Sequence, residues 1–488
     1  MFRCRQQYGL NAAQDQDKAG SQSVTDMYRV LYDKLIFPVY HALQGDRANT
    51  AIRSMDRHDA ITPEEMLRVE SGKLLRLLMH ASASVPYYRD LFLGAGLLGG
   101  NGCDESRFAM LPLLTKDIIR KEFDRLVSSD LSDNRIDPNS TSGSSGSPLS
   151  FYTDLRSKCF RKGAVTRNRK WIGIRRGDPI VHLWGSPIDA DKASALRGKL
   201  HGLVTRELFL SAYHLRDEDM LDYAGRIRKF RPRLLVGYPS ILQAFGTFCV
   251  SRGISFPSLR AIVCSAESLF DDQRDRIERF FSVPVYNRYG CREVGDIAHE
   301  VPGVRGLVVN SDRVLVEILD YEGRSCAPGE TGEIVITDLD NYGMPLIRYR
   351  IGDRGAWSDV EGRKKGLPYP VLKLVEGRVL DVVVTPDGNH IGGTYWTILF
   401  RQRPGIAIFQ VVQRRVDGVN VRYVRADGVT HVDERYFREK IQELCGAAFN
   451  VEFEVVDSIA PDATGKFRIV VSEVSGVAPA ATQSGIGR

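Results

Sequence analysis

The sequence lacks the patterns that mark disulfide, zinc and hydrolase proteins. Its eight cysteines are scattered along 488 residues and form no Cys-x-x-Cys pair, which argues against a zinc ribbon or a redox motif. In a chain of this length, scattered cysteines indicate reduced thiols and a cytoplasmic protein. The nine histidines include no His-Glu-x-x-His sequence, and no Ser–His–Asp pattern is evident, so hydrolase chemistry is not indicated.

The net charge is small, and no apolar run is long. The net charge of +6 is small for this length, and zinc-finger and RNA-binding motifs are missing, so we expect no nucleic-acid partner. Residues 1–20 contain no apolar core like that of a secretory signal. The most apolar stretch, 234–250, contains a proline and is too short to cross a bilayer. We interpret it as a strand, a turn and a helix start, and expect a soluble cytoplasmic protein without a membrane span.

The chain does contain short apolar runs that alternate with helical segments. These runs occupy 179–184, 233–240, 259–268 and 283–290. With a helix expected over 269–281, the pattern predicts a layered α/β domain with a largely parallel sheet. Ligands bind such sheets at the carboxyl ends of the strands, where we expect the loops "SAE" (265–267) and "RYG" (288–290).

Two domains are predicted, a large N-terminal layered α/β domain and a small α+β domain. Their expected limits are a flexible segment at 1–25, the large domain at 26–376, a small mobile domain at 377–475 and a disordered tail at 476–488. Helical spacing predicts a helix over 63–80, and Thr115 is an expected helix N-cap. "VPYYRDLF" (85–92) is interpreted as an exposed aromatic turn.

A run of serine and glycine stands near residue 145, in "NSTSGSSGSPLSFYTD" (139–154). Its composition is typical of a flexible linker. It also suits a phosphate-binding loop, because glycine lets the backbone approach an anion and successive N–H groups can form a nest for it. It lacks Gly-Lys-Ser/Thr and is therefore not a Walker loop. Taken alone, the run leaves linker and phosphate loop open.

Four further motifs follow the run in order. They are "YGCREVGD" (289–296), "TDLDNYGMPLIRYRIGD" (337–353), "GRVLD" (377–381) and "PDATGKFR" (461–468). Together the five motifs resemble those of the acyl-adenylate-forming enzyme superfamily. Within it they are most similar to the phenylacetate–coenzyme A ligase family, including a branch found with capsular polysaccharide biosynthesis. The resemblance covers roughly residues 60–470 and favours the phosphate loop over the linker.

The resemblance implies specific residue roles. It implies that ATP is bound by Thr141, Ser142, Gly143, Ser144, Ser145, Gly146, Ala266, Glu267, Arg288, Tyr289, Gly290, Asp353 and Arg378. In this set Tyr289 would stack on adenine, and Asp353 would accept both ribose hydroxyls, for which a carboxylate has enough lone pairs. Glu293 is the implied Mg²⁺ ligand. The implied catalytic cations are Lys466, Arg292 and Arg378.

Other assignments have plainer alternatives. The turn "GYPS" offers Tyr238, Pro239 and Ser240 as lining of an acyl pocket, with an ordinary turn as the alternative. The basic run at 161–178 is interpreted as a solvated helix face rather than a polyanion site; its cations are Arg161, Arg167, Lys170 and Arg175. Some relatives have a structural zinc near the segment that follows "YG..E", with a cysteine among its ligands; the corresponding segment here, 297–312, contains no cysteine, so no zinc is expected.

The sequence departs from the family pattern at three positions. Ser147 stands where the phosphate loop often has lysine, Arg292 where a hydroxyl residue is usual, and Leu380 where the domain hinge usually has Asp or Lys. The implied reaction is ATP- and Mg²⁺-dependent adenylation of a small carboxylic acid, followed by transfer to coenzyme A or to an amine or sugar acceptor. The alternatives are nucleotidyl transfer to a hydroxyl and a non-catalytic nucleotide- or acid-binding homologue. A homodimer is the assembly considered.

Overall fold

A computed structural model describes residues 27–28, 30–43, 48–99, 102–103, 105–130, 136–141, 149–185, 202, 204–212, 217–358, 366–376, 382–387, 390–401, 403, 405–426, 428–459 and 469–474. Outside these ranges lie most of the Ser/Gly run, the "GRVLD" motif with Arg378 and Leu380, and the motif with Lys466. The predicted domain limits at 25/26, 376/377 and 475/476 also fall there and stay predictions. In the described part of the chain, no helix is both long and apolar enough to cross a membrane.

The N-terminal region is helical. Its elements are η1 (Tyr32–Ile36), α2 (Phe37–Leu43), α3 (Ala48–His58), α4 (Pro63–Ser84), α5 (Pro86–Gly94), the small pair β1 (Leu98–Gly99) and β2 (Gly102–Cys103), η2 (Glu105–Met110), α6 (Lys116–Lys121) and η3 (Asp124–Leu126). Thr62 begins α4 with a capping box to Glu65, and Thr115 caps α6 as predicted. The predicted aromatic turn is wrong: Pro86 begins helix α5, which buries Tyr88 and Phe92.

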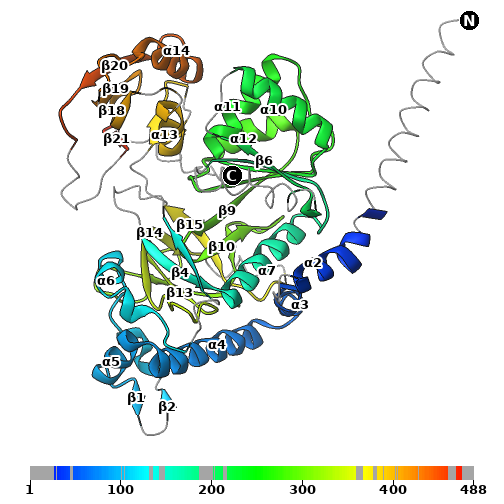
Figure 1. Cartoon of the computed structure of the whole chain (residues 1–488), viewed down its shortest axis with the longest axis vertical. Helices are drawn as coiled ribbons and strands as arrows, with labels where there is room; N and C mark the ends of the chain where they lie inside the picture. The colour runs from blue at the N-terminus through cyan, green and yellow to red at the C-terminus, as the bar shows by residue number, and fades with distance from the viewer. Residues whose placement is uncertain are drawn as a thin grey trace, which may run out of the picture.

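A mixed 11-stranded sheet forms the centre of the large domain (Figure 1). Its strands lie in the order β12 (Val314–Leu319), β13 (Gly332–Asp338), β14 (Tyr349–Trp357), β15 (Val371–Glu376), β11 (Leu307–Val309), β10 (Gly295–Glu300), β9 (Val285–Cys291), β8 (Ala261–Ser265), β7 (Leu234–Gly237), β5 (Ile180–Trp184) and β6 (Glu207–Ser211). Only the half from β9 to β6 is parallel, and the other half is antiparallel. The prediction of a largely parallel sheet therefore holds for one half only.

Helices pack against both halves of the sheet. One face of the parallel half carries α10 (Asp217–Phe230), α11 (Pro239–Ser251) and α12 (Asp271–Phe281), which bury Ile227, Phe245 and Ile277 against the strands. Helix α7 (Leu155–Trp171) packs along β10 (Figure 1). "SAE" follows β8 as expected, but "RYG" lies inside strand β9 and not in a loop, so that prediction is corrected.

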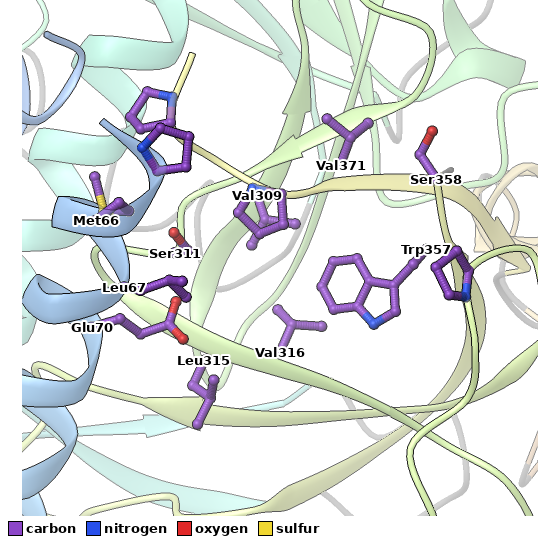
Figure 2. A pocket seen from close by; sticks show the side chains of 14 residues that line it. Met66, Leu67, Glu70, Val309, Ser311, Leu315, Val316, Trp357, Ser358 and Val371 are labelled. Carbon is purple, nitrogen blue, oxygen red and sulfur yellow. The ribbon is translucent and has the colours of Figure 1, made fainter. Parts of the chain in front are cut away.

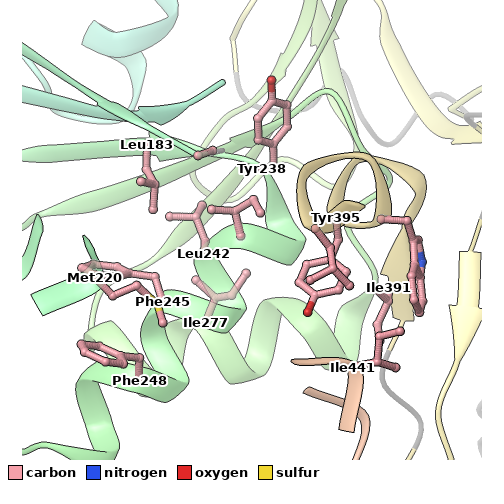
Figure 3. Packing of buried hydrophobic residues seen from close by; sticks show 14 of the residues in the cluster. Leu183, Met220, Tyr238, Leu242, Phe245, Phe248, Ile277, Ile391, Tyr395 and Ile441 are labelled. Carbon is pink, nitrogen blue, oxygen red and sulfur yellow. The ribbon is translucent and has the colours of Figure 1, made fainter. Parts of the chain in front are cut away.

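The small α+β domain is confirmed. Its sheet has the order β20 (Asn450–Val455), β19 (Gly418–Arg425), β18 (Ile406–Arg415) and β21 (Val470–Ser472), with helices α13 (Gly393–Arg401) and α14 (Glu434–Cys445) and the pair β16 (Val382–Val384) and β17 (His390–Gly392). Figure 3 shows Ile391 and Tyr395 of this domain beside α11 and α12 of the large domain. One continuous apolar core therefore joins the two domains.

Candidate functional site

The Ser/Gly run connects two strands of one hairpin. Strands β3 (Ile136–Ser140) and β4 (Ser150–Asp154) pair antiparallel on either side of it. Thr141 closes the open end, since its N–H donates to the Leu149 carbonyl and its Oγ1 accepts from the Leu149 N–H, both at 3.0 Å. A segment between paired strands does not link two domains, so the linker alternative is excluded. Residues Ser142–Gly146 themselves lie outside the described part of the chain.

This hairpin lies beside the "YGCRE" motif. Arg292 Nε donates to Asn139 Oδ1 at 3.2 Å, two residues before Thr141. Arg292 is half-buried at the turn between β9 and β10. The Asp296 carboxylate, an alternative ion partner for Arg292, lies 3.6 Å from the Arg288 guanidinium. The first and second motifs therefore meet at this turn.

The second motif also contacts the third. Tyr289 on β9 donates its hydroxyl to Asp353 Oδ2 on β14 at 3.0 Å. Burial raises the pKa of the Tyr289 phenol well above its ordinary value, and the Asp353 carboxylate raises it further, so the phenol is a neutral donor. Gly290 is required by packing, because a Cβ there would lie 2.4 Å from the Gly295 carbonyl oxygen.

Glu293 is a buried carboxylate with a single hydrogen-bond donor among the described residues. Tyr349 donates to Glu293 Oε1 at 2.8 Å, and both side chains are shielded from solvent. The pKa of Tyr349 is raised, first by burial and then by the Glu293 charge, so its proton stays on the phenol. Because Oε2 has no such donor, its lone pairs can bind a cation. Sequence reasoning did not name Tyr349 as a site residue. Its place within the "RYRIGD" motif was the signal that could have identified it.

Helix α7 supports this turn from behind. Arg161 donates to the carbonyl oxygens of Arg292, at 3.2 Å, and of Glu293, and its guanidinium lies 3.5 Å from Asp338. Sequence reasoning missed this role and predicted a solvated basic face. That prediction is wrong for Arg161 and for Arg167, which is 1% exposed, whereas Lys170 and Arg175 are exposed as expected.

The loops after β7 and β8 are joined by Glu267. Its carboxylate accepts from the N–H and the hydroxyl of Ser240, both at 3.0 Å, at the start of α11. Ala266 has a φ of 68°, a left-handed conformation that is costly for alanine and is most often maintained at functional sites. Ser265 Oγ donates to the Arg288 carbonyl at 3.0 Å, which ties this loop to β9.

Tyr238 and Pro239 begin the same turn. The Tyr238 ring stacks on Trp184 with ring centroids 4.3 Å apart, and its hydroxyl donates to the Gly185 carbonyl at 2.8 Å. These contacts bury Tyr238, Pro239 and Ser240. The described residues contain no cluster of three or more His, Cys, Asp or Glu suited to a metal ion. A metal at Glu293 would therefore need further ligands from a bound molecule or water.

Comparison with known proteins adds a family context to this geometry. Residues 383–473 match the CapK C-terminal domain family. The chain is 25% identical over 384 residues to protein CapK of Staphylococcus aureus, covering 77% of this chain and 83% of that protein. It is 25% identical over 392 residues to a phenylacetate-coenzyme A ligase of Thermus thermophilus, covering 78% and 85%.

Solved structures show the same fold. The chain aligns with a 2-hydroxyisobutyryl-CoA ligase in complex with 2-HIB-AMP and CoA in the thioesterification state, with a TM-score of 0.60 and 20% identity. That alignment covers 85% of this chain and 91% of the ligase. The postadenylation state of the same ligase gives a TM-score of 0.58 at 19% identity, over 86% of this chain and 92% of the ligase.

Proposed function

From its kinship with CapK and the phenylacetate–coenzyme A ligases, which confirms the resemblance that the five motifs predicted, we propose that this chain is an adenylate-forming enzyme. Its reaction is the ATP-dependent activation of a small carboxylic acid. The single observation that supports this most directly is the contact of Tyr289 with Asp353, 3.0 Å between hydroxyl and carboxylate. In the proposed roles, this contact joins the ring that would stack on adenine to the carboxylate that would bind the ribose, and a nucleoside site needs both groups close together.

The reaction joins two anions. A carboxylate oxygen attacks the α-phosphorus of ATP, the bond from that phosphorus to the bridging oxygen breaks, and pyrophosphate leaves with the electron pair. Positioning and charge neutralisation must therefore supply most of the catalysis. We assign positioning of adenosine to Tyr289 and Asp353, and neutralisation of phosphate charge to Arg292 and Lys466. Arg378 and the N–H groups of the Ser/Gly run are proposed to complete the phosphate contacts.

The site fits a magnesium ion at Glu293. Mg²⁺ is usually held by one or two carboxylates together with phosphate oxygens, and Glu293 offers one carboxylate oxygen that accepts no hydrogen bond from the described residues. Bound there, Mg²⁺ would neutralise phosphate charge. Tyr349 orients the Glu293 carboxylate through Oε1, and Arg161 fixes the main chain on which Glu293 stands.

The acceptor in the second half-reaction is proposed to be an amine or a sugar, in a pathway of polysaccharide biosynthesis, rather than coenzyme A. Related enzymes turn the small domain between the two half-reactions. Leu380 is at the sequence position where the resemblance implies the pivot, and we propose that the apolar core shared by Tyr395, Ile391 and α11 opposes that rotation (Figure 3). An ion pair between Arg276 and Asp387, at 3.4 Å, adds to the same interface. Rotation would have to expose this surface, which costs free energy.

The first experiment tests adenylation. The purified chain is incubated with ATP, Mg²⁺ and a panel of aryl and hydroxylated carboxylic acids, and pyrophosphate is measured. Acid-dependent pyrophosphate release supports the proposal. Release that depends on an added alcohol or sugar and not on an acid would instead show nucleotidyl transfer. Nucleotide binding without any release of pyrophosphate would show a non-catalytic homologue.

The second experiment tests the acceptor. The acyl-adenylate is trapped with hydroxylamine to give its rate of formation, and coenzyme A is then supplied in place of hydroxylamine. We expect adenylate formation to continue and the thioester, detected by mass, to form slowly or not at all. Thioester formation as fast as adenylation would show that the chain is an ordinary acid–thiol ligase.

A further inference from the structure

A cavity of about 300 Å³ lies between helix α4 and the antiparallel half of the sheet, apart from the candidate nucleotide site. Its walls are largely apolar and include Met66, Leu67, Val309, Val316, Trp357 and Val371. Strand β14 carries both Asp353 and Trp357, four residues apart, which is about 13 Å along a strand. The volume is at the lower end of the range for small-molecule sites.

Two polar groups converge in this apolar space. Figure 2 shows the Glu70 carboxylate, from α4, and the Trp357 indole, from β14, pointing into the cavity from opposite sides. Ser311 also lines the cavity; this residue is 2% exposed, and its hydroxyl has no hydrogen-bond partner among the residues that the structure describes. It lies near enough to Glu70 to lower the carboxyl pKa without reaching hydrogen-bond geometry. An unpaired hydroxyl at this depth is uncommon unless something else binds it.

Glu70 has no cationic partner within the described part of the chain. Lys73, three residues further along α4, pairs with Asp340, and Arg167 pairs with Asp312. The pKa of Glu70 is raised to about 7, chiefly by burial; the nearby Ser311 hydroxyl lowers it by less, and the Asp312 charge adds the smallest increase. The carboxylate is therefore left without compensation, which is costly in an apolar setting.

We propose that this cavity is a binding site for a small organic amine with an aromatic or branched aliphatic body. The ammonium group would form an ion pair with the Glu70 carboxylate. It would also make a cation–π contact with the Trp357 ring. The Ser311 hydroxyl would gain a polar neighbour, and the apolar body would fill the space between Val309, Val316 and Val371. A metal ion is disfavoured here because a single carboxylate faces the cavity and the walls are apolar.

The site is tested with 2-phenylethylamine as the probe, using calorimetry on the full chain. 2-Phenylethanol is the neutral comparison and phenylacetate the anionic one. We expect the amine to bind more tightly than either, and Glu70→Gln to weaken it about 10-fold or more. The matched control is Glu64→Gln, which removes an exposed carboxylate from the first turn of the same helix and should leave amine binding unchanged.

A pH series gives a second readout. Because the ammonium needs the ionised carboxylate, amine binding should strengthen from pH 6 to pH 8 and should release protons near pH 7. AMP binding should be the same in Glu70→Gln and in the unmodified chain, which separates this site from the proposed function. The proposal is overturned if the amine does not bind at millimolar concentration, if Glu70→Gln leaves its affinity unchanged, or if 2-phenylethanol binds as tightly at every pH.

Discussion

Removing the Arg167 side chain should destabilise the large domain severely. Its guanidinium donates to both oxygens of Asp312, at 2.6 and 2.9 Å, to Asn310 Oδ1 at 2.8 Å and to the Tyr369 hydroxyl at 2.6 Å. The two charged side chains are 1% and 0% exposed. Removing one partner of such a pair leaves a buried charge and typically costs about 3–5 kcal/mol. We therefore expect Arg167→Met to lower the thermal midpoint by more than ~5 °C.

The pH dependence follows from Asp312. In the unmodified chain its carboxyl pKa is held below its ordinary value of 3.8 by Arg167, despite burial, so the stabilisation is present above that value and is lost only in strong acid. Without Arg167 the carboxyl pKa rises. The loss of stability should then be largest at neutral pH and should shrink as the pH falls and the carboxyl takes up a proton.

The assay compares urea and thermal unfolding of single and double variants. Arg167→Met combined with Asp312→Asn should be less destabilised than the sum of the two single variants, since the double variant has no orphaned charge. The matched control is Lys170→Met on the same helix. Lys170 pairs with Asp56 at 2.6 Å, but the side chains are 57% and 35% exposed, so the expected loss is under ~1 kcal/mol. Equal small losses for Arg167→Met and Lys170→Met would refute the reasoning.

Three further predictions concern the proposed nucleotide site. Tyr289→Ala should weaken AMP binding by about 5- to 150-fold through lost stacking, whereas Tyr289→Phe should cost only a few-fold, measured by calorimetry; equal affinities in both variants would argue that the ring is only a packing residue. Arg292→Ser should raise the KM for ATP or slow pyrophosphate release, and an unchanged ATP titration would show that Arg292 serves the turn alone. Lys466→Ala should lower pyrophosphate release about 100-fold or more, equivalent to ~3 kcal/mol, with little change in nucleotide binding, and unchanged turnover would reject the role.

Local sequence signals predicted most elements but not how distant elements pair. The hairpin turning between β18 and β19, the helix α14 and the alternation through β5, β7 and β8 follow from turn residues and periodicity. The antiparallel half of the sheet could not be predicted from such local signals. Its strand β11 pairs with β10 and with β15, which begins more than sixty residues later, and no local pattern encodes that choice.

The aromatic segment at 85–92 was misread although its signal was present. Pro86 is favoured at the first position of a helix, and Tyr88 and Phe92 are four residues apart on one helix face. Arg167 was different, because its burial depends on Asp312, 145 residues away, and a helix of many cations gives no hint of which one has a buried partner. Charge in a sequence indicates exposure only when no distant partner exists.

One helix explains why motifs so far apart in the sequence meet. Asp154 caps the start of α7 through the Ser157 N–H and also accepts from the N–H groups of Tyr342 and Gly343, which fixes the third motif against the Ser/Gly hairpin. Arg161 follows on the same helix, with six residues between it and Asp154. It donates a hydrogen bond to the main-chain carbonyl of Glu293 in the second motif. The hairpin, the turn that carries Glu293 and the third motif are therefore held by the same rigid element. Substitution of Arg161 should then disturb the turn without removing any group that we propose to touch ATP, so its effect on turnover should exceed its effect on AMP binding.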